Sequence, residues 1–499
     1  MTRLFDNIKL FNLLKVPVRF KHPPHHWSVL QKKKSHSQRA LDHFDDFYKN
    51  VYGQSWSNIR SALLAKNHKY IAVVNNFSDT TRICQDLETL GAMNMKLIYD
   101  ASKKNQAIQQ ELKKKKKVLK EIKRIDQQLD HIVSETKSKY SIYPKSYEID
   151  AQVVEKTTFD DNKSFKPVKL QSIETDLNIV NDSSRIIMPS SGITAEQLYE
   201  YIPATEIKGM DDFILESEHY GHYSKGADFV IQIEEDHTLN FPDQLLIYTF
   251  EESNDMIFPK SKTGTTKVSD YFILDGASIL PVLSLDLKPG DRLLDMCAAP
   301  GGKLMIALQS LIPEIIVAND VQQSRINRIN YFINEFLGTM NFWDKRFLIT
   351  QNDGRYIEDK DIYNKILVDV PCTTDRHVLH EDDNNLFKAS RIKERLKLPE
   401  LQTELLKNAL KLVKVGGTVV YSTCTLSPIQ NDGIVRMALK KSFEESQVVH
   451  VVKDQTRALD PLRYLYNFGN YGLKYGHIVI PSKSRNFGPM YFCKIIRVK

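Results

Sequence analysis

The second half of the chain, from about residue 266, alternates short apolar runs with longer amphipathic stretches. Five runs are apolar or β-branched and have the length of strands: 291–297, 314–320, 347–353, 365–370 and 417–423. The stretches between them are long enough for helices. Such an alternation specifies a mostly parallel sheet with helices on both faces. We therefore predict a doubly wound α/β fold for this half.

Two further apolar runs close the sequence, at 477–481 and 490–498, with Gly488-Pro489 between them. We interpret them as a terminal antiparallel hairpin on the edge of the sheet. Near the other end of the chain, residues 40–64 place apolar and aromatic positions at helical spacing. That spacing is typical of helices that pack against a core.

Residues 101–135 have a different, basic pattern. Their apolar positions are spaced alternately by four and three residues, which predicts a helix with one apolar seam: Val118, Ile122, Ile125, Leu129 and Ile132. This apolar seam is equally suited to packing against a partner protein and to packing against the rest of this protein. Residues 134–185 are polar and aperiodic. We interpret 101–185 as an insertion with a helical first half and a flexible second half.

The positive charge is concentrated in two segments, although the formal net charge is only +7. Residues 1–40 hold nine Lys and Arg against one acid, and residues 101–124 hold ten against two. This indicates a polyanion partner or a targeting signal, and a solvated surface explains each segment equally well. The first 22 residues are basic and amphipathic, which is typical of a mitochondrial transit peptide. A disordered or RNA-contacting tail is the alternative.

The five cysteines are odd in number and widely spaced, without a CxxC pair. This spacing argues against a disulfide framework and against a zinc site, so we expect no metal and a reducing compartment. No run approaches the roughly 18 apolar residues that a membrane span requires. We expect no membrane partner.

Three of the predicted strands end in residues suited to binding a ligand, at the edge where parallel sheets bind theirs. The first runs into Gly301-Gly302-Lys303, where paired glycines let the backbone approach a ligand before a helix begins. The second ends in Asp320, placed to bind ribose hydroxyls, and the third in Asp353-Gly354. Each acid is equally suited to cap the following helix.

The fourth and fifth predicted strands end at Cys372 and Cys424, and Asp369 lies beside the first of these. In a sheet ordered 3-2-1-4-5 these two strands are neighbours, so the sulfurs are predicted to lie close together. Buried cysteines are commonly just small apolar residues. Two at adjacent strand ends, one beside an acid, indicate a reactive site.

The motifs at these strand ends, LDMCAAPGGK (294–303), VDVPC (368–372) and STC (422–424), closely resemble those of the Sun-domain RNA cytosine-5 methyltransferases. Longer matches at 371–402, 421–432 and 486–494 are similar to the mitochondrial branch, which modifies small-subunit ribosomal RNA. The resemblance is dense over 266–499, weaker over 25–75 and 195–265, and absent from 101–185.

The resemblance implies a Rossmann-like methyltransferase fold that uses S-adenosylmethionine (SAM). It assigns Cys424 as nucleophile, Cys372 as an aid to product release, and Asp369 as facing both methyl donor and base. The implied SAM-binding residues are Gly301, Gly302, Lys303, Asp320 and Arg325 on the ribose side, Asp353 and Gly354 at the adenine, and Asp369. The chain departs from the usual pattern at Leu304, where Thr is common, and at Thr425, where Ser is common.

Cytosine carbon 5 is a poor nucleophile, so a thiolate must first add to carbon 6, and the base must be unpaired or flipped out. Basic residues that follow the fourth strand are candidates to grip phosphates, with a solvated helix face as the alternative: Lys388, Arg391, Lys393, Arg395 and Lys397.

With the resemblance, the chain divides into a targeting segment (1–26), a helical or α+β region (27–100), the insertion (101–185), the rest of an RNA-facing N-terminal extension (186–265) and a catalytic domain (266–499). The expected location is the mitochondrial matrix. The resemblance implies ribosomal RNA, mitochondrial ribosomal subunits and a helical-repeat protein related to transcription-termination factors as partners. Alternatives are an RNA-binding assembly factor with a methyltransferase fold, a transfer RNA cytosine-5 methyltransferase, and a methyltransferase acting on a small molecule or protein.

Overall fold

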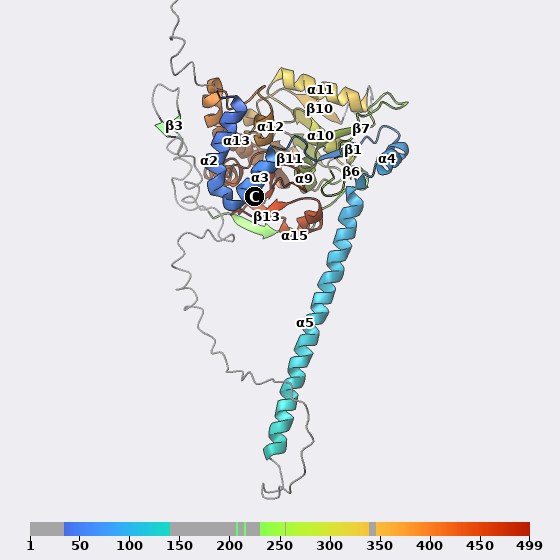
Figure 1. Ribbon diagram of the computed structural model, residues 1–499. Helices are drawn as coiled ribbons and strands as arrows, with labels where there is room; N and C mark the ends of the chain where they lie inside the picture. The colour runs from blue at the N-terminus through green and yellow to red at the C-terminus, as the bar shows by residue number, and fades with distance from the viewer. Residues whose placement is uncertain (1–33, 140–205, 208–213, 216–229, 255, 339–345) are drawn as a thin grey trace, which may run out of the picture.

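The predicted parallel sheet forms in the computed structural model, which describes residues 34–139, 206–207, 214–215, 230–254, 256–338 and 346–499 (Figure 1). Its parallel strands are β8 (Arg292–Asp295), β9 (Ile315–Asn319), β10 (Phe347–Thr350), β11 (Tyr363–Asp369) and β12 (Val413–Thr423). They lie in the order β10-β9-β8-β11-β12. This is the predicted order 3-2-1-4-5, so β11 and β12 are neighbours.

Helices cover both faces of this sheet, because alternate strand residues enter two separate cores. Ile366 and Val368 of β11 pack with α13 (Ile392–Leu412) and α14 (Ile434–Ser446). Leu367, between them, packs with α9 (Ile279–Ser284), α10 (Gly302–Gln309) and α11 (Gln323–Leu337). Side chains alternate across a strand, so one buried run serves both cores. The doubly wound fold is confirmed.

The terminal hairpin is present, but its predicted place at the sheet edge is wrong. β15 (His477–Val479) pairs antiparallel with β16 (Met490–Arg497). β16 lies inside the sheet, between β12 and β13 (His450–Asp454), and β5 (Gln232–Glu235) continues the sheet beyond β13. The first six residues of β16 are buried, as an interior strand requires.

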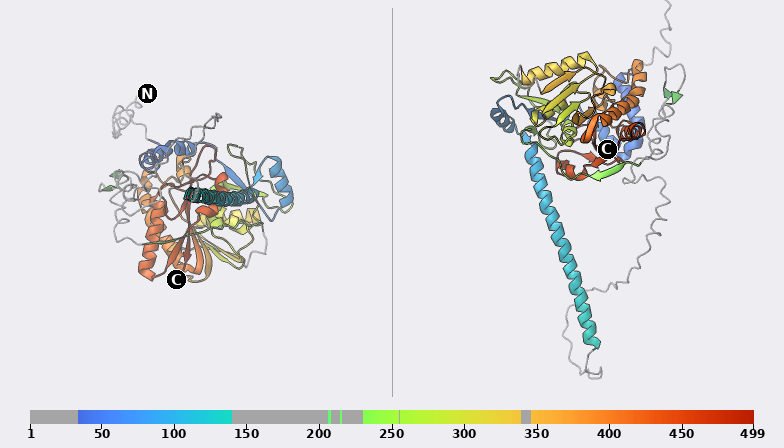
Figure 2. Two further views of the ribbon diagram at one scale, coloured as in Figure 1. Left: turned by 90° about the horizontal axis from the view of Figure 1, so that it is seen from below. Right: turned by 180° about the vertical axis from the view of Figure 1, so that it is seen from behind.

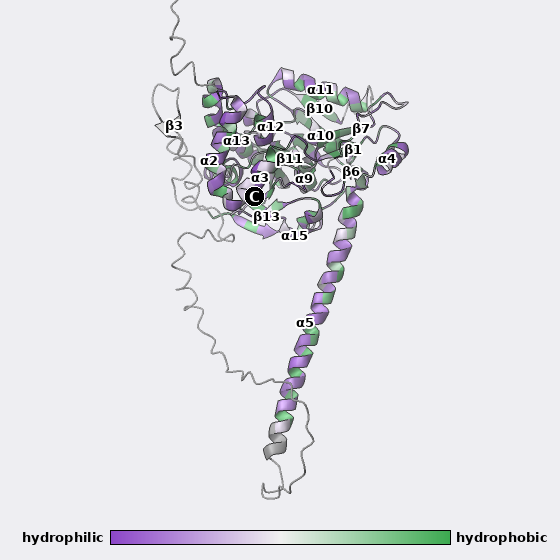
Figure 3. Cartoon of the chain, viewed as in Figure 1, coloured by the Kyte–Doolittle hydropathy of each residue, from purple (hydrophilic) through white to green (hydrophobic). Residues whose placement is uncertain are grey.

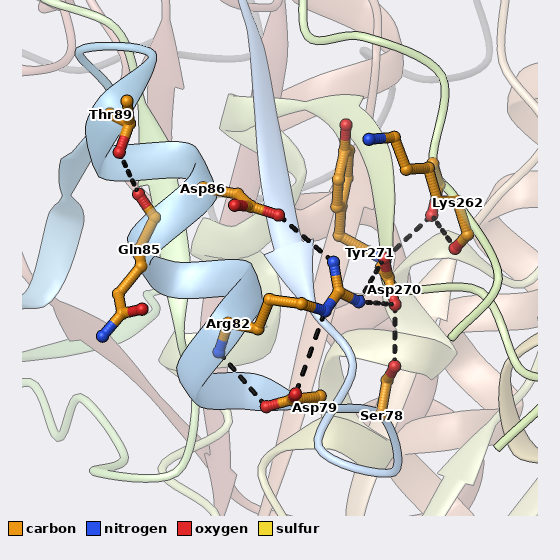
Figure 4. Close-up of polar contacts among 10 residues, drawn as sticks. Ser78, Asp79, Arg82, Gln85, Asp86, Thr89, Lys262, Asp270 and Tyr271 are labelled. Atoms are coloured by element: carbon orange, nitrogen blue, oxygen red, sulfur yellow. Dashed lines mark hydrogen bonds and ion pairs between the residues drawn. The ribbon is translucent and has the colours of Figure 1, made fainter. Parts of the chain in front are cut away.

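A second, smaller sheet joins segments from both halves of the chain. Its order is β2-β6-β1-β7, built from β1 (Tyr70–Val74), β2 (Met93–Asn94), β6 (Ile247–Thr249) and β7 (Tyr271–Asp275). Arg82 of α4 (Thr80–Thr89) donates to both carboxylate oxygens of the buried Asp270 at 2.9 and 2.8 Å (Figure 4). β7 lies beyond residue 266 yet pairs with β1, and the division into domains stays a prediction.

The helical spacing at 40–64 corresponds to α2 (His36–Tyr52) and α3 (Trp56–Leu63). Phe44, Tyr48 and Trp56 are buried in the same core as α13 and α14. α2 packs against α12 (Asp375–His380), the short helix that follows β11. These N-terminal helices therefore reach the carboxyl ends of the strands, where the cysteine motifs lie.

The predicted basic helix forms α5 (Met95–Lys139), 45 residues long, and it projects from the body of the protein (Figures 1 and 2). Its first turns are anchored through the buried Met95 and Tyr99. The predicted apolar seam is exposed, with Val118 at 56% and Ile125 at 51%, and Figure 3 shows apolar positions among polar ones along the coloured part of the helix. Residues 140–185, with the predicted flexible half, lie outside the described residues, as does the targeting segment.

The remaining elements are short: η1 (Gly53–Ser55), β3 (Glu206–Ile207), β4 (Ile214–Leu215), η3 (Gly276–Ser278), η5 (Gly354–Tyr356), η6 (Ala389–Arg391), η7 (Ile429–Gly433), α15 (Thr456–Leu459), η8 (Asp460–Tyr464) and β14 (Phe468–Gly469). Among the described residues, no helix has both the length and the apolar character needed to cross a bilayer.

Candidate active site

The carboxyl ends of the parallel strands surround a cavity of about 1010 Å³. Ala299 and Pro300 line it from the loop after β8, Arg325 and Arg328 from α11, and Cys372 from the loop after β11. This is the edge at which open parallel sheets bind ligands. The cavity therefore lies where the sequence placed the site.

The two cysteines predicted to be neighbours are in direct contact. The Sγ atoms of Cys372 and Cys424 lie 3.2 Å apart, and both thiols are free. A disulfide would bring them to about 2.05 Å, so the contact is a hydrogen bond between sulfurs. This bond, burial and the nearby Asp369 raise the pKa of Cys424 well above its usual value, and Lys303 opposes them. Cys424 is a thiol in this state and must lose a proton to become a nucleophile.

Asp369 is held at the end of β11 by two donors. Ser422 Oγ donates to its Oδ1 and Lys303 Nζ to its Oδ2, each at 2.8 Å. Burial disfavours the ammonium of Lys303, but its interactions with Asp369, Cys424 and Asp295 together outweigh burial, and the pKa of Lys303 is raised. Lys303, predicted to contact SAM, is thus also the counter-ion of Asp369. Ser422 was missed because a serine inside a strand motif has no distinguishing pattern.

A buried carboxyl, Asp295 at the end of β8, was also missed by the sequence analysis. It is 1% exposed, and its Oδ1 accepts no hydrogen bond from the described residues. Burial, then repulsion from Asp369, raises the pKa of Asp295 to about 8, and Lys303 opposes the shift. Asp295 is therefore largely protonated near neutral pH.

The glycine loop and Asp320 fit a bound nucleoside. Gly301 has φ +114°, and an added Cβ would lie 3.1 Å from Phe332 Cδ1, so only glycine suits this turn. Asp320 is 2% exposed, and its Oδ2 accepts no hydrogen bond in the described part of the chain, although Arg325 Nε lies 3.4 Å away. A buried carboxylate oxygen without a donor suits a ligand hydroxyl.

Asp320 is not the cap of the next helix, because α11 begins after Gln322. Its Oδ1 accepts from the Gln322 amide at 3.2 Å, a turn that leaves Oδ2 directed elsewhere. Arg325 donates to the Ala299 carbonyl at 2.9 Å and so ties α11 to the glycine loop.

Asp353 and Gly354 have local structural roles. Asp353 caps η5 by accepting from the Arg355 amide at 3.0 Å, and it pairs with the Arg355 guanidinium at 2.6 Å. This hydrogen bond lowers the pKa of Asp353. A Cβ on Gly354 would lie 2.8 Å from both Leu405 and Met296. The capping alternative thus holds for Asp353, and a contact with adenine stays a prediction.

The basic candidates after β11 are only partly directed at the cavity. Arg391 and Lys397 line it, but Arg391 is paired with Glu394 at 2.6 Å, and Arg395 lies over the Phe387 ring. Further basic side chains, Arg328 and Arg355, line the cavity from other elements. No local sequence pattern joins residues of α11 and η5, which is why these two were missed.

No group of His, Cys, Asp or Glu in the described part of the chain has the arrangement of a metal site. The chemistry-bearing residues of this site are instead the thiol pair and the carboxyls around it.

Comparison with known proteins identifies the family of the chain. A family model described as 16S rRNA methyltransferase RsmB/F matches residues 282–465. The 5-cytosine rRNA methyltransferase nsun-4 of Caenorhabditis elegans is 32% identical over 93% of both chains, and NSUN4 of Xenopus laevis is 30% identical over 95% of this chain and 93% of its own. The mitochondrial tRNA (cytosine(34)-C(5))-methyltransferase of Mus musculus is 33% identical over 51% of this chain and 71% of its own.

The similarity to the first two relatives extends over nearly the whole of each chain, and the family model covers the glycine loop and both cysteines. The resemblance seen in the strand-end motifs is thereby confirmed. The chain belongs to the RsmB/F family of SAM-dependent RNA cytosine-5 methyltransferases.

Proposed function

We propose that this protein methylates carbon 5 of a cytosine in mitochondrial small-subunit ribosomal RNA, with Cys424 as attacking thiolate and Cys372 as an aid to release. The observation that carries the proposal is the pair of free thiols 3.2 Å apart beside Asp369. A methyltransferase for small molecules or proteins has no need of such a pair.

The steps follow from the chemistry of the ring. The Cys424 thiolate forms a bond to carbon 6, which makes carbon 5 an enamine carbon able to attack a methyl group. Once carbon 5 carries the methyl group, a base takes its proton, the electrons of that bond restore the double bond between carbons 5 and 6, and the Cys424 sulfur leaves carbon 6 as a thiolate. Asp369, fixed by Ser422 and Lys303, is oriented to stabilise the charge that develops on the ring. Cys372, in contact with Cys424, is placed to act at the release step.

We propose that the glycine loop, Lys303, Asp320, Arg325, Asp353, Gly354 and Asp369 hold SAM. When bound, SAM supplies an electrophilic methyl group. Asp320 would bind the ribose hydroxyls through Oδ2, which accepts no hydrogen bond in the described part of the chain, and Arg325 would keep the loop and α11 together. The backbone at Gly301 would approach the ligand closely because no side chain intervenes.

Asp320→Ala tests the ribose contact. We expect SAM binding to weaken by about 1–3 kcal/mol, because ribose hydroxyls lose a charged acceptor in a buried site. Isothermal calorimetry measures this directly. Glu314→Ala is the matched control. Glu314 is an exposed acid that directly precedes the first residue of β9, at the end of the strand away from Asp320, and the variant should bind SAM as the wild type does. Unchanged affinity in Asp320→Ala would exclude the ribose role.

The proposed substrate rests on three observations: the two relatives that match nearly end to end are named rRNA methyltransferases, the longer motifs resemble the mitochondrial branch, and the first 22 residues are basic and amphipathic. We propose residues 1–26 as the targeting segment and the matrix as the location. Mitochondrial ribosomal subunits and a helical-repeat protein are the proposed partners. The proposed domains are a helical or α+β region (27–100), the insertion (101–185), the rest of the RNA-facing N-terminal region (186–265) and the catalytic domain (266–499).

Bisulfite sequencing of RNA from cells that carry only Cys424→Ser tests the substrate. We expect a single bisulfite-resistant cytosine to disappear from mitochondrial small-subunit ribosomal RNA. Loss of a mark from a transfer RNA instead would favour the activity named for the mitochondrial relative of mouse. If every bisulfite-resistant cytosine persists while assembly of the ribosomal subunit still depends on the protein, the result would favour an assembly factor with a methyltransferase fold.

We also propose that the projecting helix α5 binds RNA at a distance from the cavity. In the described part of the chain, none of the lysines 113–117 forms an ion pair with a carboxylate, and all are exposed. At 1.5 Å per residue the helix is about 65–70 Å long, so these charges can reach phosphates far from the target base.

Changing lysines 113–117 to Gln should weaken binding of a long structured RNA while leaving methylation of a short oligonucleotide unchanged. The slope of log affinity against log salt should fall by about 0.7–0.9 for each phosphate that the variant no longer neutralises. Filter binding at several salt concentrations measures the slope. The same five changes to Arg keep the charge and should keep the slope. A Gln variant with the wild-type slope would show that α5 does not bind RNA.

A further inference from the structure

A buried carboxylate joins the two segments that carry the cysteines. Asp375, the first residue of α12, is fully buried. Its Oδ1 accepts from Thr373 Oγ1 at 2.8 Å, just after Cys372. From the segment after Cys424, Thr425 Oγ1 donates to Oδ1 at 2.9 Å and the Leu426 amide to Oδ2 at 2.8 Å. One side chain thus holds both cysteine segments.

The fourth donor to this carboxylate comes from far away in the sequence. Tyr48 of α2 is 1% exposed, and its Oη donates to Asp375 Oδ2 at 2.7 Å. One turn along the same helix, Tyr52 Oη donates to the Leu426 carbonyl at 2.6 Å. The ring of Tyr48 is itself fixed between Phe44 and Trp56, with ring centroids 5.0 and 5.4 Å away.

We propose that Asp375 and Tyr48 are positioning residues, which set the contact between Cys372 and Cys424 and make the N-terminal helix α2 a part of the active site. The proposal deepens the proposed function, on which it rests. A carboxylate has about four acceptor positions, and four donors from three segments occupy them here. Such a saturated buried group leaves the attached loops little freedom to shift.

The arrangement gives α2 a role in the active site although α2 lies outside the stretch matched by the family model, 282–465. Two sulfurs that must act in sequence on one base require a fixed spacing, and a displacement of about 1 Å can slow a reaction about a hundredfold. Neither cysteine touches Asp375 through its side chain. The carboxylate acts through the backbone of the two loops, including the amide of Asp375 that donates to the Cys424 carbonyl at 3.4 Å.

Asp375→Asn and Tyr48→Phe in the full-length protein test the proposal. Asn places an amide NH₂ against groups that are themselves donors, so both cysteine loops should loosen. The first readout is the pH dependence of Cys424 alkylation by iodoacetamide, located by peptide mass spectrometry. Cys424 faces Cys372, Asp369 and Lys303, and its contact with Cys372 raises its pKa. We expect the profile to move to lower pH in Asp375→Asn, and by less in Tyr48→Phe.

The second readout is steady-state methylation, where kcat should fall about a hundredfold in Asp375→Asn with KM for RNA nearly unchanged. Tyr466→Phe is the matched control, since Tyr466 is also buried and donates one hydrogen bond, to the Gly276 carbonyl at 2.7 Å. It should lower Tm as Tyr48→Phe does but leave the alkylation profile unchanged.

The proposal would be overturned if the Tyr48→Phe protein folds and has the wild-type alkylation profile and kcat. If Asp375→Asn does not fold, Tyr48→Phe alone tests the proposal. The alkylation measurement needs neither RNA nor SAM. A protein that methylated no RNA would therefore still show the shift, which separates failure of this inference from failure of the proposed function.

Discussion

Cys424→Ala is expected to abolish both methyl transfer and the covalent protein–RNA adduct, whereas Cys372→Ala is expected to accumulate that adduct. Without Cys424 no sulfur attacks carbon 6, and the ring stays unreactive. Without Cys372, Cys424 loses the hydrogen bond that contributes most to its raised pKa, so attack is preserved while release is impaired. Denaturing gels of enzyme mixed with labelled RNA and SAM measure the adduct.

The control for the cysteine variants is Cys84→Ala, which removes a partly buried thiol from α4, next to the smaller sheet. It should methylate at the wild-type rate and leave no adduct. An adduct with Cys424→Ala and none with Cys372→Ala would reverse the assignment of the two residues.

The sequence was sufficient to predict the order of the five parallel strands and the contact between the cysteines. The position of each strand follows from a local signal, a compact apolar run with its functional residue at the end. The order of the strands comes from the doubly wound fold class, and the contact between the cysteines follows from that order. The position of β16 inside the sheet was not predictable in the same way. It depends on β13 and β5, and β5 is a four-residue strand with every residue exposed, which leaves no apolar pattern to detect.

The residues missed in the site are those whose role depends on tertiary contacts. Asp295 lies in the same strand motif as the glycine loop, but its burial becomes visible only when α10 and the neighbouring strands enclose it. Tyr48 precedes Asp375 by 327 residues, and its helical spacing indicated packing alone. A packed tyrosine and a tyrosine that packs and donates to a carboxylate have the same sequence pattern.

Asp369→Asn is the second variant with a large expected effect, because it changes the charge of the whole site. We expect methylation to fall about 10²- to 10³-fold, the loss typical when one preorganised electrostatic contact to a transition state is removed. Lys303 would lose the partner that sustains its raised pKa. Tritium transfer from SAM to RNA measures the activity. Ser422→Ala, which leaves the charge and the Lys303 pair intact, is the control and should lose less.

The effect of Asp369→Asn on stability depends on Asp295. Breaking a buried ion pair by removing one partner typically destabilises a protein by about 3–5 kcal/mol, and the pair of Lys303 and Asp369 is only partly buried, with side-chain exposures of 12% and 30%. Here the loss should be smaller, because Asp369 no longer repels Asp295, which can ionise and become the counter-ion of Lys303. The charges that act on Asp295 are Asp369, Lys303 and Asp320, and removal of the first lowers the pKa of Asp295.

Replacement of Asp369 by Asp295 as the counter-ion of Lys303 should change the pH dependence of the free energy of unfolding. In the wild type the pKa of Asp295 is about 8, above its ordinary unfolded value of about 4, so the native state holds a proton that the unfolded chain releases. The stability contributed by Asp295 is therefore complete below about pH 4 and is lost as pH rises toward 8. In Asp369→Asn that decline should end at a lower pH, because the pKa of Asp295 is lower. Urea unfolding between pH 5 and 9 measures this decline, and parallel curves for wild type and variant would show that the two carboxyls do not interact.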